Sequence, residues 1–209
     1  MLADAPRYAG ASQTQSMSES RFLTRPGRAW MDAQAGLVAD VEAMVVASDS
    51  DRCRSFVVEA SLVSLVSQFQ LACRNLFALA ASEIESLIGG ELGVVVESGL
   101  VAGSHLARGN ASARNLAADF KRIGVDVWDL QFPVGMEGMT ARWALDDVNE
   151  CRNELAHGRD PDVDVEGLVL ADVHNTASTL DMMVRTIERG VVERLRSYGV
   201  DFDNRIGGE

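Results

Sequence analysis

The feature that most constrains this chain is a continuous helical pattern from about residue 52 to residue 88, with apolar residues on most of its faces. Gly89-Gly90 follows the segment and provides a natural helix stop. A helix that is apolar nearly all round either lies at the centre of a fold or contacts another chain. Both uses fit this segment. Polar residues interrupt it, so we do not expect it to span a bilayer: Glu59, Gln68, Gln70, Arg74 and Asn75.

Apolar residues also recur at helical spacing along the rest of the chain. Helices are predicted over residues 29–47, 111–123, 139–156 and 165–198. Asp164 is the expected N-cap of the last helix and Gly199 its end, with Gly190 as a weak point inside it. The segment 91–111 fits either a short helix or an extended piece, followed by a loop. No alternating run is long enough to argue for a sheet.

The length of 209 residues and the hydrophobic content of 47% are enough for one domain with a substantial core. We therefore expect a single all-α domain over residues 29–199. Residues 1–28 are predicted to be a flexible leader and residues 200–209 a short tail. The leader lacks the apolar core of a signal peptide, and the three cysteines lack metal-ligand spacing. We expect a cytoplasmic protein with buried, reduced thiols.

The net charge of −12 limits the ways in which this chain can bind nucleic acid. Nonspecific nucleic-acid binders are usually basic, because contacts to phosphates supply most of their affinity. An RNA or DNA function would therefore depend on a local basic cleft or on transient contact with the substrate.

The most informative short stretch is RNELAHG, residues 152–158. Gly158 is a natural helix stop, which places His157 at a helix C-terminus, where the helix dipole favours its protonated form by roughly 0.3–1 kcal/mol. Arg152 precedes His157 by five positions, or about 140° around an ideal helix. The two side chains would share a face only if the last turn unwinds, which Gly158 permits. The plain alternative is a capping histidine beside a solvated arginine.

The stretch VNECRNELAHG, with an apolar-patterned helix before it and a long helix after it, resembles the HEPN superfamily, and within it the RiboL-PSP type. The family motif is an arginine, a polar residue that is often asparagine, a short spacer and a histidine. Arg152, Asn153 and His157 match it position by position. An upstream helix with a late acidic pair (Glu83 and Glu85) and the closing sequence FKRIGV also fit, so the resemblance covers about residues 30–198.

The resemblance implies an all-α, HEPN-like helical bundle with long central and C-terminal helices. Such domains form two-fold homodimers in which the motifs face each other. Active members are metal-independent endoribonucleases that need no cofactor and act as toxins of toxin–antitoxin pairs or as abortive-infection effectors against phage. RNA, a second copy and an antitoxin protein are then the expected partners, and the expected product carries a 2′,3′-cyclic phosphate. Other members are catalytically inactive modules that bind a partner protein or a nucleotide.

The chemistry of the residues agrees with this expectation. Arg152 can hold a phosphate bidentately, and His157 can act as acid or base. Asn153 can orient His157 or bind phosphate. Arg159 stands where one branch of the family has a modified tyrosine, and it is either a phosphate contact or a solvated turn residue. Arg142 is a candidate extension of the basic cleft.

The other histidines and the acidic pair receive plainer interpretations. His105 lies in a predicted loop and is expected to be structural or solvated. His174 is expected on a helix surface or at a dimer contact, and Glu83 and Glu85 on a solvated helix face. No cluster of Asp, Glu and His has the spacing of metal ligands.

Overall fold

The computed structural model describes residues 24–134, 136–157 and 168–202, with the side chain of His157 excepted, and these residues contain no β-strand. The prediction of an all-α fold is therefore confirmed for this part of the chain. The elements in chain order are α1 (Arg25–Ala47), α2 (Asp51–Ile88), α3 (Gly90–Ala102), α4 (Ala113–Arg122), the short 3-10 helix η1 (Val127–Asp129), α5 (Gly138–His157) and α6 (Leu170–Ser197).

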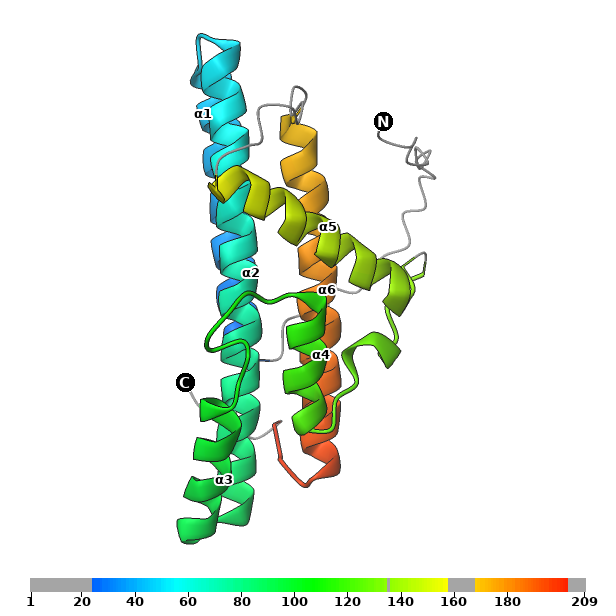
Figure 1. Ribbon diagram of the computed structural model, residues 1–209. Coiled ribbons are helices and arrows are strands. Elements are labelled where there is room, and N and C mark those ends of the chain that lie inside the picture. Colours follow the sequence, from blue (N-terminus) through cyan, green and yellow to red (C-terminus); the bar gives the residue numbers. More distant parts are fainter. Residues whose placement is uncertain (1–23, 135, 158–167, 203–209) are drawn as a thin grey trace.

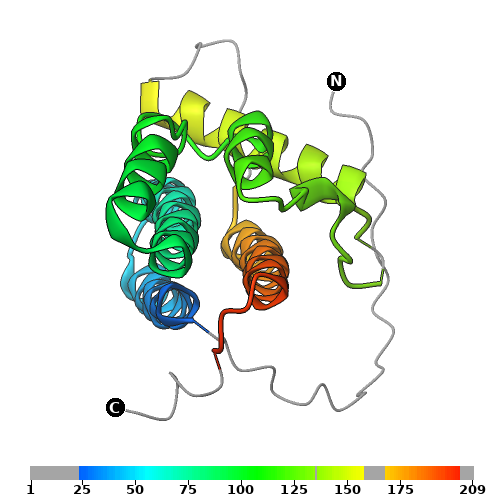
Figure 2. The same cartoon turned by 90° about the horizontal axis from the view of Figure 1, so that it is seen from below.

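The three long helices α1, α2 and α6 pack side by side, and α3, α4 and α5 lie together on one side of them (Figures 1 and 2). Helix α5 runs obliquely across α2 and α6, with its C-terminal end against α2 (Figure 1). Edge-to-face aromatic pairs join the elements: Trp30 of α1 meets Phe69 of α2 at 6.2 Å, and Phe77 of α2 meets Phe120 of α4 at 5.8 Å between ring centroids.

Helix α2 is the central element of the fold. It contacts α1, α3, α4, α5 and α6, and 12 of its residues are buried. Of the two uses that the sequence left open for this apolar helix, the structure shows the central one. By length and composition alone α2 would also pass as a membrane-spanning helix, which is weak evidence, because the core helices of soluble proteins pass the same test.

Two predicted boundaries were wrong. Helix α1 begins at Arg25, four residues before the predicted start at residue 29, because Thr24 caps it and Pro26 occupies its first turn. The buried carboxylate of Glu188 on α6 accepts hydrogen bonds from the Thr24 amide and hydroxyl, which fixes this end of α1 to α6. Helix α6 begins at Leu170 with Val169 as its N-cap, so the predicted N-cap Asp164 is also wrong.

The cysteine prediction holds only in part. Cys73 is fully buried on α2, and burial raises the pKa of its thiol, so that the thiol stays protonated and unreactive. Cys151 is half-buried on α5. Cys53 is exposed in the first turn of α2, which corrects the expectation that all three thiols are buried.

The loop between α3 and α4, residues 103–112, is held by the buried carboxylate of Asp119 on α4. Asp119 accepts hydrogen bonds from the backbone amides of His105 and Leu106, from the Ser104 hydroxyl and from the His105 ring. Burial alone would raise the pKa of Asp119, but these hydrogen bonds outweigh it and lower the pKa below its ordinary value of 3.8.

The Asp119→Asn substitution is expected to reduce the free energy of unfolding by about 2–3 kcal/mol near neutral pH. The side-chain NH2 group of asparagine cannot accept hydrogen bonds, so it would leave donors without a partner that now bond to the carboxylate. A lowered folded-state pKa adds stability that is present above pH 3.8 and is lost as the pH falls through the folded-state value. The difference between wild type and variant should therefore shrink below pH 3.8. Denaturant titration at several pH values measures it. The exposed control Asp126→Asn should change stability by less than about 0.5 kcal/mol, and an equal loss in both variants would contradict this role for Asp119.

Helix α6 continues through Gly190, where the absence of a side chain lets Leu130 pack closely against the helix backbone. A Cβ atom there would lie 2.6 Å from Cδ2 of Leu130, which packs over this turn from the segment after η1. Gly36 in the middle of α1 has open space around it, and a Cβ atom added there would meet nothing within 4 Å.

We expect Gly36→Ala to raise the free energy of unfolding by about 0.5–1 kcal/mol, the ordinary gain of alanine over glycine in a helix. Gly190→Ala should lower it by about 1 kcal/mol, because the clash with Leu130 exceeds that gain. Thermal or denaturant unfolding of the two variants provides the comparison. Stabilisation of both by the same amount would show that Leu130 does not restrict this position.

Candidate active site at the C-terminal end of α5

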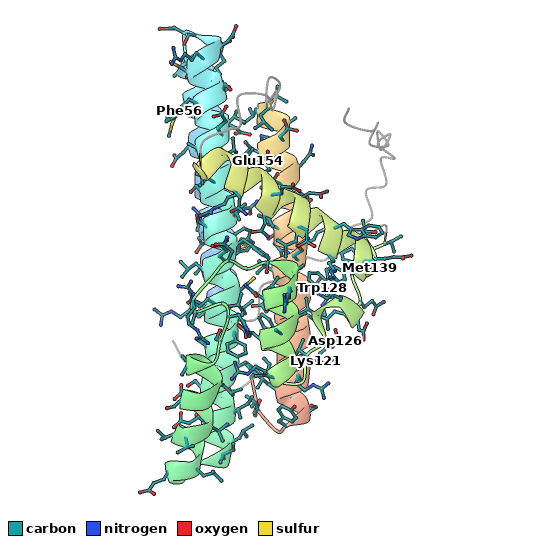
Figure 3. The ribbon with its side chains drawn as sticks, viewed as in Figure 1. Phe56, Lys121, Asp126, Trp128, Met139 and Glu154 are labelled. Carbon is teal, nitrogen blue, oxygen red and sulfur yellow. The ribbon has the colours of Figure 1, made fainter. Side chains whose placement is uncertain are left out.

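The first residue of α5, Gly138, packs directly against the backbone of η1. A Cβ atom at Gly138 would overlap the carbonyl oxygen of Trp128, so only glycine permits this approach to η1. Ala141, Leu145 and Asn149 follow at four-residue steps and are buried, which defines the inner face of the helix. Figure 3 shows the length of α5, with Met139 near its start and Glu154 near its end against α2.

Asn149 is the polar residue of this inner face and connects α5 to the loop before α4. Its Nδ2 donates to the carbonyl oxygens of Ala111 at 3.3 Å and Leu145 at 2.9 Å. Its Oδ1 is buried without a hydrogen-bond partner among the described residues. A buried acceptor without a partner costs about 1–3 kcal/mol unless water or a ligand supplies a donor.

Arg152 lies one turn after Asn149 and is half-buried. Its Nη1 donates to Oδ1 of Asn153 at 3.1 Å, so the structure brings these two predicted residues together. Its Nε is buried without a hydrogen-bond partner, and across residues 24–134, 136–157 and 168–202 no carboxylate forms an ion pair with this guanidinium. A partly desolvated cation without a counter-charge is a site that favours an anion.

His157 is the last residue of α5, as the sequence predicted for a histidine at a helix C-terminus. Its side chain is not among the described atoms. The backbone is helical through this residue, so the unwinding that would bring the two side chains to one face does not occur within α5. Positions 152 and 157 therefore point about 140° apart around the helix axis.

Arg142, another predicted phosphate contact, is not joined to Arg152. Arg142 is exposed near the start of α5, about 15 Å away along the axis at 1.5 Å per residue. The outer face between them carries exposed carboxylates at Asp146, Asp147 and Glu150, and Glu154 follows. Arg159 lies outside the described residues.

The remaining candidates occupy structural positions. Nδ1 of His105 lies 3.0 Å from Oδ1 of Asp119, as described for the loop, and Nε2 of His174 on α6 lies 3.2 Å from Oε1 of Glu42 on α1. Glu83 and Glu85 belong to the end of α2 next to α3, whereas α5 ends farther up α2 (Figure 1). Within the described residues, no three His, Cys, Asp or Glu side chains are grouped to hold a metal ion.

Sequence reasoning missed Asn149. The signal that identifies it is its spacing: it stands three positions before Arg152 and four after Leu145, on the apolar face of the helix. A polar residue on such a face is either satisfied in the core or available to a ligand, and Asn149 is satisfied on one side of its amide only.

Comparison of the chain with protein-family models, with curated proteins and with solved structures finds no match in any of the three.

If the role of Arg152 is to bind an anion, its side chain should contribute little to the free energy of unfolding. We expect Arg152→Met to leave the free energy of unfolding unchanged or to raise it by up to about 1 kcal/mol, because methionine fills the space without a desolvated charge. Chemical denaturation measures the change. A loss of about 2 kcal/mol or more would indicate a structural arginine instead.

Proposed function

We propose that this chain is a metal-independent endoribonuclease of the HEPN type that acts as a two-fold homodimer. The observation that supports it most is the state of Arg152, which is half-buried. Within the described residues its Nε has no hydrogen-bond partner and no carboxylate forms an ion pair with its guanidinium group. Five positions later on the same helix stands the motif histidine, His157, at the negative end of the helix dipole. A partly desolvated cation and, five positions later on the same helix, a proton-transfer group are two of the groups that cleavage of a phosphodiester uses.

The proposed reaction is an internal transfer. The ribose 2′-oxygen attacks the adjacent phosphorus, a base accepts the 2′-OH proton, and an acid donates a proton to the departing 5′-oxygen. The P–O5′ bond breaks, and the products are a 2′,3′-cyclic phosphate and a 5′-hydroxyl. Arg152 would stabilise the charge on the phosphoryl oxygens, and each proton-transfer group contributes about 10²–10⁴ in rate.

The reaction uses two proton-transfer groups, and one chain offers a single motif histidine. A two-fold axis near the end of α5 would place a second His157 opposite the first, because every residue near such an axis meets its own copy. The divergence of positions 152 and 157 on one helix favours this arrangement, since a single α5 does not direct both positions to one side.

The biological role that we propose follows from the resemblance of the motif: a toxin of a toxin–antitoxin pair or an abortive-infection effector against phage, acting in the cytoplasm on RNA. An antitoxin protein would then be a further partner, and Asn153 would hold Arg152 or His157 in place. A non-catalytic module that binds a partner protein or a nucleotide is the alternative outcome of the test below.

Purified wild-type protein is expected to cleave total RNA in the presence of EDTA and to leave cyclic-phosphate ends. His157→Ala and Arg152→Met should each reduce the cleavage rate by at least about 10²-fold, the range for loss of a proton-transfer group or of charge stabilisation. Gel analysis of the RNA with end-group mapping provides the measurement.

Matched controls separate loss of chemistry from loss of folding. His174→Ala removes another helical histidine, and Arg189→Met removes an exposed arginine of α6; both should cleave at the wild-type rate. If the wild type leaves RNA intact, or if His157→Ala cleaves as fast as the wild type, the nuclease proposal is wrong and the binding module takes its place.

A further inference from the structure

Positive charge is concentrated in one segment of this acidic chain. Residues 98–124 contain four basic residues and one acidic residue, a net charge of +3, which leaves −15 for the rest of the chain. The acidic residue is Asp119, whose buried carboxylate already accepts hydrogen bonds from the 103–112 loop. The charge that this segment presents to solvent is therefore positive.

Two arginines of this segment, and one on α2, lie in or beside the loop between α3 and α4. Nε of Arg74 on α2 donates to the Leu106 carbonyl at 3.0 Å, and Nε of Arg108 lies 3.4 Å from the Ser104 carbonyl. Arg114 is exposed in the first turn of α4. We call the exposed surface formed by Arg74, Arg108 and Arg114 the loop surface.

These guanidinium groups retain most of their hydrogen-bonding capacity. A guanidinium has five N–H donors, and the contacts of Arg74 and Arg108 to the loop each use the Nε donor alone. The terminal N–H groups are the pair that binds a phosphate in a bidentate manner. All three residues are exposed, so a polyanion can reach them.

The loop that carries Arg108 is held in one conformation. Asp119 fixes its first turn, the Asn115 side chain donates to the Asn110 carbonyl at 2.8 Å, and Asn149 on α5 donates to the Ala111 carbonyl. A loop that is ordered before binding loses less entropy when a ligand arrives, which favours affinity.

One of these hydrogen bonds ties the loop that carries Arg108 to the helix of the candidate active site. Asn149 connects Ala111 to α5 one turn before Arg152, and the loop lies on the same side of the long helices as α5 (Figures 1 and 2). The outer face of α5 carries the exposed carboxylates already named, Asp146, Asp147, Glu150 and Glu154, and repels phosphates. Approach to Arg152 from the loop side is therefore electrostatically favoured.

We propose that the loop surface binds phosphates of the RNA strand that flank the scissile phosphate, and so guides the strand to Arg152. This inference rests on the proposed function and adds to it a substrate-binding surface outside the motif. It also explains how a chain with a net charge of −12 could bind RNA, because the contacts to phosphates would be confined to one basic surface.

The test is the double variant Arg108→Gln/Arg114→Gln in a His157→Ala background, in which bound RNA stays intact. Binding of a fluorescein-labelled single-stranded RNA is measured by anisotropy at several salt concentrations. We expect the dissociation constant to rise by at least about 10-fold. The slope of log K against log salt should fall in magnitude by about 1.4, since each lost contact to single-stranded RNA removes about 0.7. Arg74 stays unchanged because its side chain also holds Leu106.

The matched control is Arg28→Gln/Arg52→Gln, which removes the same charge from exposed positions on α1 and at the start of α2. It should bind RNA with the affinity and salt slope of the parent. Equal weakening in control and loop variants would attribute the effect to net charge and overturn the inference. Absence of RNA binding by the parent would overturn it as well.

A cleavage assay with otherwise wild-type protein separates this inference from the nuclease proposal. We expect Arg108→Gln/Arg114→Gln to raise KM by about the same factor as the dissociation constant and to leave kcat unchanged. Cleavage with an unchanged KM would retain the nuclease and reject the loop surface. Loss of RNA affinity in the loop variant of a chain that does not cleave would support the loop surface and reject the nuclease.

Discussion

The burial of α2 is the constraint on which the rest of the structure depends. Its apolar faces require cover in several directions, and α1, α3, α4, α5 and α6 all pack on it. Helices α1 and α6 run beside it, while α5 crosses it obliquely (Figure 1). That crossing places the end of α5 against a rigid support, and the RNELAHG motif stands at that end. The packing of α5 on α2 thus determines the position of the motif in the fold.

Polar groups inside this packing divide into satisfied and unsatisfied ones, and the unsatisfied ones lie on α5 and on α2, where Gln68 and Gln70 each leave an amide atom without a partner among the described residues. Asp119 is surrounded by donors and fixes a loop. Asn149 uses its amide nitrogen to attach that loop to α5. Its oxygen, like Nε of Arg152, has no hydrogen-bond partner in the part of the chain that the structure describes. Unsatisfied buried groups reduce stability, and the two on successive turns of α5 are the ones that the proposed anion site would satisfy. The resemblance of the motif and the chemistry of these groups both favour a phosphodiester.

Much of this architecture could be predicted, and the failures have physical causes. The length of α2 followed from its periodicity and from Gly89-Gly90, which are local signals, whereas its central position was one of two uses that its apolar pattern allowed. The start of α1 was misplaced because Thr24 is fixed by Glu188, a partner far away in sequence. For the site, the motif identified Arg152, Asn153 and His157 as candidates, whereas Asn149 and the loop surface depend on contacts between α5 and the loop that periodicity cannot show.

The most direct test of the central claim is a subunit-mixing titration, in which wild-type protein and His157→Ala are unfolded, mixed in varying proportions and refolded before RNA cleavage is measured. If two copies of His157 serve one site across a two-fold axis, mixed dimers are inactive and activity falls as the square of the wild-type fraction. A straight-line fall would show that each chain carries a complete site of its own. That result would contradict the shared site that we propose.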